Sequence, residues 1–237
     1  MRENLVRYLV WQMRDFARER AVALLLIGLA IGFTTIAPFK AMQVTFDDVA
    51  ARRVLLISLP QVAFIAAFVA FNGMISSDRK MGYYRFLFSK PVSIPMFYAQ
   101  RFVVYMVGFL AVFALLLGVF GLVVKPVAPL GALAYCALVY LSLGGIAFFI
   151  SSLFRHDWPI LAAVFLGSSI LHSIWDTREG WRRMVISVLP PLHKLNAALG
   201  DIVSRGTVDT TAVLWLLGYS AFFFAAGLMV LRRRPIG

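Results

Sequence analysis

Long apolar runs alternate with short polar segments along the whole chain. Six stretches carry almost no charge, and each is long enough for an α-helix to cross the hydrocarbon layer of a membrane. Of the 237 residues, 61% are hydrophobic and 14% charged, whereas a soluble domain is about half apolar and a quarter charged. The pattern predicts an all-α membrane protein, a single domain over residues 1–237, with transmembrane helices at 21–39, 54–75, 102–124, 129–153, 159–175 and 212–231.

Residues 4–20 precede the first span and repeat apolar side chains at three- and four-residue spacing. This period is typical of an amphipathic helix lying in the membrane plane, with its apolar side in the acyl chains. The apolar side holds Leu5, Val6, Leu9, Val10, Met13, Phe16 and Ala17. We expect Trp11, Arg14, Phe16 and Arg18 to lie at the membrane interface. The alternative is a plain cytoplasmic extension of the first span.

The segment 76–101 joins the second and third spans and is rich in basic residues. Asp78 suits the start of a short helix, where a carboxylate is favourable. Pro91 ends that helix, because the residue before a proline is displaced from the α region. The helix is too short to span a membrane, so we expect it to pack against a partner.

The loop 176–211 contains two short amphipathic patterns separated by Pro190 and Pro191. The first pattern comprises Trp181, Met184, Val185, Val188 and Leu189, and the second comprises Leu192, Leu195, Leu199, Ile202 and Val203. They predict two short helices on, or dipping into, the outer leaflet. A solvated loop is the alternative.

Basic residues orient the chain, because cytoplasmic segments are enriched in Lys and Arg. With a cytoplasmic N-terminus, fourteen of them lie inside and nine outside, so we expect both termini in the cytoplasm. No small-residue cleavage motif follows a short apolar run, so a cleaved signal peptide is not expected. Anionic membrane lipid and this orientation rule explain much of the net charge of +12, so no nucleic-acid partner is expected.

Motifs of catalysis and metal binding are missing from the sequence. It contains no H-E-x-x-H, no G-x-S-x-G and no P-loop, and its three histidines are scattered, so we expect neither an enzyme nor a metal site. No Asp, Glu, Lys or Arg lies well inside a predicted span, which argues against a proton- or sodium-coupled carrier. Gly144, Gly145, Gly118 and Gly121 indicate close helix packing.

These features together resemble the ABC-2 type permease family. The architecture matches over nearly the whole chain, and the local motif covers the loop after the second span. There, Asp78 takes the place of the family's usual Glu, Gly82 matches its Gly, and Tyr83 departs from the usual Thr. Ser89-Lys90-Pro91-Val92-Ser93 matches its proline motif, and Arg101 matches its later basic residue.

The resemblance implies the membrane subunit of an ATP-driven exporter in a prokaryotic cytoplasmic (inner) membrane. Residues 4–20 would be the connecting helix, 76–101 would contain the cytoplasmic coupling helix, and 181–204 would form outer re-entrant helices. The coupling helix would contact a separate ABC ATPase subunit, present in two copies, which binds ATP and Mg²⁺. The contact residues would be Asp78, Arg79, Gly82, Tyr84, Arg85, Leu87, Ser89, Lys90 and Pro91.

A second permease chain, identical or similar, would complete the transporter. By resemblance the second and fifth spans would line its path, through Gln61, Phe64, Phe68, Asn72, Phe165 and Ser169. These aromatic residues could instead only fill the bundle. A rival hypothesis from another class is a polytopic assembly or scaffold protein that does not transport. The sequence does not identify a substrate.

Overall fold

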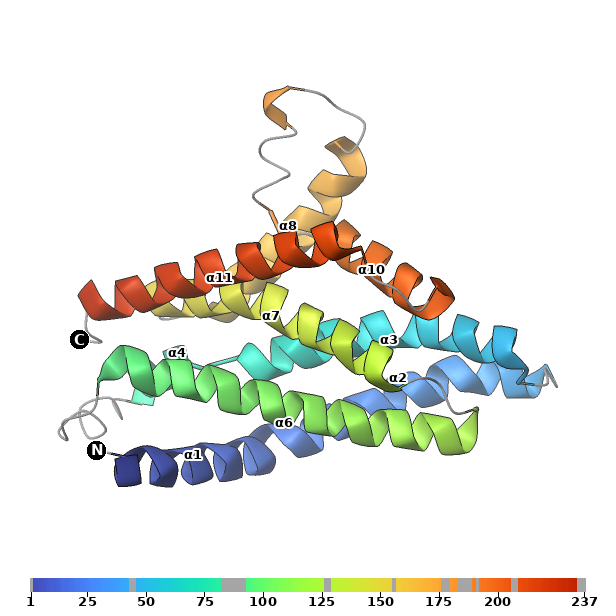
Figure 1. Cartoon of the computed structure of the whole chain (residues 1–237), viewed down its shortest axis with the longest axis horizontal. Helices are drawn as coiled ribbons and strands as arrows, with labels where there is room; N and C mark the ends of the chain where they lie inside the picture. The colour runs from blue at the N-terminus through green and yellow to red at the C-terminus, as the bar shows by residue number, and fades with distance from the viewer. Residues whose placement is uncertain are drawn as a thin grey trace. The chain divides into compact units, whose positions relative to one another are not determined.

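A computed structural model describes residues 2–42, 46–81, 93–125, 129–154, 157–175, 180–182, 189–190, 192–205 and 209–233. In the described part of the chain, all regular secondary structure is helical (Figure 1). Its helices are α1 (Arg2–Phe16), the π-helical η1 (Ala17–Ala21), α2 (Val22–Ala41), α3 (Asp48–Phe71), α4 (Ser76–Met81), α6 (Ile94–Val123), α7 (Pro129–Leu153), α8 (Asp157–Trp175), α10 (Leu192–Arg205) and α11 (Thr210–Arg233).

Six of these helical stretches are long and apolar enough to cross a membrane, which confirms the predicted number of spans. They run over Val6–Ala41, Asp48–Asp78, Ile94–Val123, Pro129–Leu153, Asp157–Trp175 and Thr210–Arg233. Backbone groups in lipid find hydrogen-bond partners only inside a helix or a closed barrel. The hydropathy pattern and the helices therefore coincide closely.

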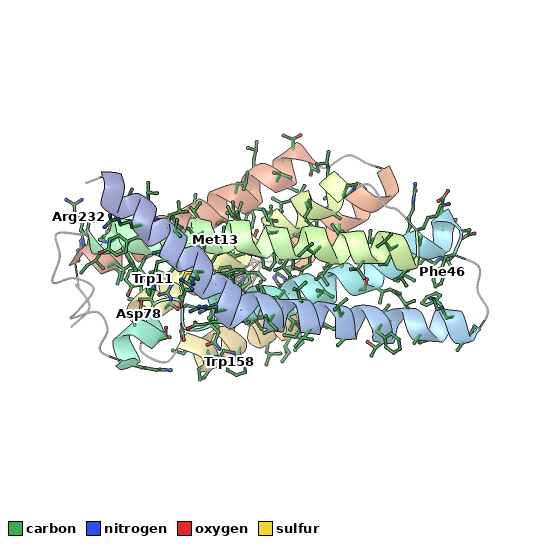
Figure 2. The ribbon with its side chains drawn as sticks, turned by 90° about the horizontal axis from the view of Figure 1, so that it is seen from below. Trp11, Met13, Phe46, Asp78, Trp158 and Arg232 are labelled. Atoms are coloured by element: carbon green, nitrogen blue, oxygen red, sulfur yellow. The ribbon has the colours of Figure 1, made fainter. Side chains whose placement is uncertain are left out.

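The N-terminal helix passes from α1 into α2 without a break, through the π-helical η1. Figure 2 shows the ribbon changing direction along this stretch, near Trp11 and Met13. A π segment is a common place for a helix to bend, because one extra residue interrupts the regular hydrogen bonds. The orientation of residues 4–20 in the membrane plane stays a prediction.

The chain divides into two compact units. Unit 1 comprises 1–70, 100–140 and 198–209, and unit 2 comprises 71–99, 141–197 and 210–237. In unit 1, α6 packs along α1 and α2 (Figure 1). A Cβ atom at Gly28 would overlap Leu116, and one at Gly108 would overlap Phe16. Tyr140 of α7 donates a hydrogen bond of 2.9 Å to the Phe102 carbonyl of α6.

In unit 2, α7 and α11 approach so closely that only glycine fits at one position. A Cβ at Gly145 would lie 2.6 Å from the Ser220 carbonyl oxygen, and the Ser220 hydroxyl donates to the Leu141 carbonyl at 2.6 Å. This confirms the predicted packing role of Gly145. A Cβ at Gly118, in contrast, would meet nothing within 4 Å, so the same prediction is wrong for Gly118 within this chain.

The second amphipathic pattern of the loop before the last span coincides with α10 (Leu192–Arg205). Its apolar side chains Leu195, Leu199 and Ile202 are buried. Of the residues in the first pattern, the structure describes Trp181, which is helical, and Leu189, which is not. Whether these segments re-enter the outer leaflet stays a prediction.

Candidate functional site

The segment predicted to be the coupling helix begins at a glycine turn after α3. Gly73 has φ +70°, a left-handed conformation that glycine adopts without steric cost. The turn is closed by a hydrogen bond of 3.1 Å from the Met74 amide to the Phe71 carbonyl, and Ser77 N donates to Gly73 O at 3.3 Å. The helix α4 then starts at Ser76.

Asp157 joins α4 to two spans of unit 2. Its carboxylate is 1% exposed and accepts a hydrogen bond of 2.8 Å from the Ser76 hydroxyl of α4. It also accepts one from the hydroxyl of Ser151, in the last turn of α7. Because Asp157 begins α8, the positive end of that helix dipole also favours its charge. We call Asp157, Ser76 and Ser151 the α4 anchor.

Asp78 attaches α4 to α6 at a second point. Its side chain is 6% exposed, and the buried Tyr98 hydroxyl donates a hydrogen bond of 3.1 Å to it. The carboxylate predicted to contact a partner is therefore directed into this chain. Figure 2 shows Asp78 and Trp158, the residue after Asp157, near the same end of unit 2. Of Arg79 the structure describes the backbone only, and Gly82, Tyr84, Arg85, Leu87, Ser89, Lys90 and Pro91 lie outside the described residues.

A second cluster of polar side chains, in unit 1, surrounds Tyr105 of α6. Arg101 forms an ion pair with Asp15 of α1, at 3.2 Å between Nη2 and Oδ2. The Arg101 Nε donates to the Tyr105 hydroxyl at 3.0 Å, and that hydroxyl lies 3.4 Å from Asp15 Oδ2. The ion pair and the hydroxyl together hold α1 against α6.

Arg20 connects this cluster of polar side chains to the end of α3, the second span. Its guanidinium lies 4.7 Å from the centre of the Tyr105 ring, a cation–π distance. It donates to the carbonyls of Val69, at 3.0 Å, and Ala70. These carbonyls belong to the last turn of α3, where no amide of the helix can reach them. Arg20 thus caps α3 close to the point where the chain leaves it.

Three of the four predicted membrane-interface residues lie on the surface of unit 1. Trp11 is 47% exposed, and Arg14 and Arg18 are exposed as well. Phe16 differs, since it is 2% exposed and its ring lies 5.2 Å from that of Tyr105. The prediction that Phe16 faces acyl chains is wrong within this chain, because Gly108 of α6 leaves room for its ring.

The predicted path residues fall in both units. Gln61, Phe64 and Phe68 lie on one side of α3 in unit 1, where Gln61 is exposed and the two rings are half-buried. In unit 2, Asn72 and Ser169 are exposed and Phe165 is buried. The hypothesis that these residues line a path stays a prediction.

Sequence reasoning missed Asp157 and the Asp15–Arg101 pair. Asp157 is followed two residues later by Pro159, an arrangement typical of a helix start, and that signal could have moved the predicted span start to 157. Nothing in the sequence pairs Asp15 with Arg101, because 86 positions separate them.

Replacing Asp157 with Ala should loosen α4. The hydroxyls of Ser76 and Ser151 would lose their acceptor, at a cost of about 1–3 kcal/mol, so α4 should detach more often. We expect trypsin to cut after the exposed Lys80 about tenfold faster than in the parent protein. Mass spectrometry of the fragments measures the rate. Asp209→Ala, at an exposed carboxylate, is the control, and equal rates in both variants would contradict the anchor.

Comparisons of the chain with protein-family models, with curated proteins and with solved structures find no match.

Proposed function

We propose that this chain is the membrane subunit of an ATP-driven transporter, working as an exporter with a separate ATPase. The observation that best supports this function is the attachment of α4 to three spans, at Tyr98, Ser151 and Asp157, which all belong to unit 2. Asp78 bonds to Tyr98 of α6, and Ser76 bonds to Asp157 of α8, which also holds Ser151 of α7. A force applied to α4 would therefore act on three spans through short polar contacts.

Such an attachment suits a helix that receives a push from outside the membrane. In the proposed cycle, ATP binding brings two ATPase subunits together and displaces the segment 76–91. The α4 anchor would pass this displacement to α7 and α8, and the hydrogen bond between Asp78 and Tyr98 would pass it to α6. The three helices would tilt and move a central site from inward- to outward-facing. ATP and Mg²⁺ would be held by the ATPase, and this chain would supply the path without breaking a bond.

Two copies of the chain, or one copy with a similar permease, would engage the two ATPase subunits. A pair of identical chains would meet across a two-fold axis with the path on that axis. The exposed position of Gln61 on α3 suits a side chain that faces such a path. The proposed location is a prokaryotic cytoplasmic membrane with both termini in the cytoplasm.

The ATPase contact can be tested by purifying the tagged chain from its own membranes in a mild detergent. We expect an ATP-binding subunit, labelled by a photoreactive azido-ATP, to co-purify with it and to hydrolyse ATP. Gly82→Trp or Arg85→Glu should each lower the amount recovered by about tenfold or more, because a bulky or charge-reversed residue at an interface centre is poorly tolerated.

Arg52→Glu is the matched control, since Arg52 is an exposed cation of α3 expected on the opposite side of the membrane. Undiminished recovery of the ATPase with both loop variants would contradict the assigned contact. If the parent chain brings down no ATP-binding subunit at all, the proposed function itself fails and the scaffold hypothesis gains.

A further inference from the structure

Unit 1 contains an apolar groove between α2, α3 and α6. It has a volume of about 370 Å³, within the usual range of small-molecule sites of about 300–1,000 Å³. Its lining is aliphatic and aromatic apart from Ser58 and Lys40, and the Ser58 hydroxyl is already bonded to the Val54 carbonyl. An occupant would therefore meet apolar side chains along the groove and one cationic side chain, that of Lys40.

The open side of the groove lies on the surface of α2. Leu29 and Phe33 line it and are 44% and 73% exposed. Between them sits Gly32, where a Cβ would meet nothing within 4 Å. Because α2 belongs to the first of the six candidate spans, this side faces hydrocarbon or another chain rather than water.

Basic side chains collect where the groove ends. Lys40 lies in the last turn of α2, and Lys125, just after α6, forms a 2.6 Å ion pair with Asp48 at the start of α3. Arg52 and Arg53 follow on α3 and are exposed. Asp47 is occupied in bonding the Ala50 amide at 2.7 Å. Four cationic side chains and two carboxylates are thus found in these segments, and one cation is paired with one carboxylate, which leaves a net positive charge at this end of the groove.

We propose that the groove binds one anionic phospholipid, with an acyl chain between α2, α3 and α6 and the phosphate at Lys40. The apolar lining matches the chain, and the basic end matches the headgroup. A helix of a second copy could fill the groove, but it would not neutralise Lys40. The inference depends only on the membrane location and not on the proposed transport function.

The test compares phosphatidylglycerol and phosphatidylcholine with identical acyl chains, added to the purified protein in a nonionic detergent. Native mass spectrometry counts the lipids that stay bound. The parent protein should retain one phosphatidylglycerol in preference to phosphatidylcholine. Gly32→Leu places a side chain in the groove and should weaken retention of both lipids by about tenfold. Gly118→Leu is the matched control on α6, where space is also open, and should bind as the parent does.

Lys40→Gln should keep phosphatidylcholine binding and lower the preference for phosphatidylglycerol by about fivefold. Arg232→Gln, an exposed cation of unit 2, should leave that preference unchanged. Lys40 is itself exposed, so its variant tests the proposal even if Gly32→Leu does not fold. Equal retention by Gly32→Leu and Gly118→Leu, or an unchanged preference in Lys40→Gln, would overturn the proposal. The proposal would also be overturned if the parent protein formed a dimer without bound lipid and the Gly32→Leu variant did not, because a second copy would then occupy the groove.

Discussion

Arg101→Met is expected to lower the free energy of unfolding by about 3–5 kcal/mol, because it leaves the Asp15 carboxylate without its charged partner. The side chains of Arg101 and Asp15 are only 5% and 20% exposed, so water cannot replace the lost contact well. The Tyr105 hydroxyl would lose its Arg101 donor at the same time. Thermal unfolding in detergent should show a fall in Tm of about 10 °C.

A double variant separates the ion pair from the packing around it. Asp15→Leu combined with Arg101→Met removes both charges, so it should recover at least half of the loss, as apolar replacements of buried ion pairs do. Tyr105→Phe is the milder control, since it removes one hydroxyl and leaves the ring beneath Arg20. If Arg101→Met were as stable as the parent, the pair would not hold α1 to α6.

Gly145→Ala is expected to destabilise unit 2 by about 2 kcal/mol, the cost of overpacking a close contact. The added methyl group would lie 2.6 Å from the Ser220 oxygen and 3.0 Å from its Cα. Both atoms belong to the backbone of α11 and cannot turn aside as a side chain does. The helices α7 and α11 would have to move apart, which would also stretch the hydrogen bond from Ser220 to Leu141.

Gly218→Ala on α11 and Gly167→Ala on α8 are the matched controls. A Cβ at either position would meet nothing within 4 Å, so alanine should stabilise each helix by up to about 1 kcal/mol. The same substitution should therefore have opposite signs at Gly145 and at the two control positions. Unfolding by titration with a denaturing detergent measures the three changes, and a stabilised Gly145→Ala would refute the close contact.

In the segment predicted to contain the coupling helix, the residues of the family motif and the residues that the structure describes differ. The motif Ser89-Lys90-Pro91-Val92-Ser93 lies mostly outside the described residues. The structure instead describes how the segment starts, at Gly73, Ser76 and Asp78. Of these only Asp78 was singled out from the sequence, as a helix-start acid and partner contact, and its bond to Tyr98 was not foreseen. Side-chain hydroxyls such as Ser76 and Tyr98 carry no positional signal in an apolar sequence.

Hydropathy alone predicted the six spans, because lipid forces each apolar stretch to satisfy its own backbone hydrogen bonds. The spacing of apolar residues predicted the amphipathic helix at 192–205. Only the tertiary structure decided which polar residues at the ends of those spans meet. Asp157 finds Ser76 across 81 positions, and Arg20 finds the end of α3 across about 50. It likewise decided that Gly145 is in close contact while Gly118 is not. Helix periodicity predicts on which side of a helix a residue lies. It does not predict which residue of another helix lies against that side, because this depends on how the helices pack.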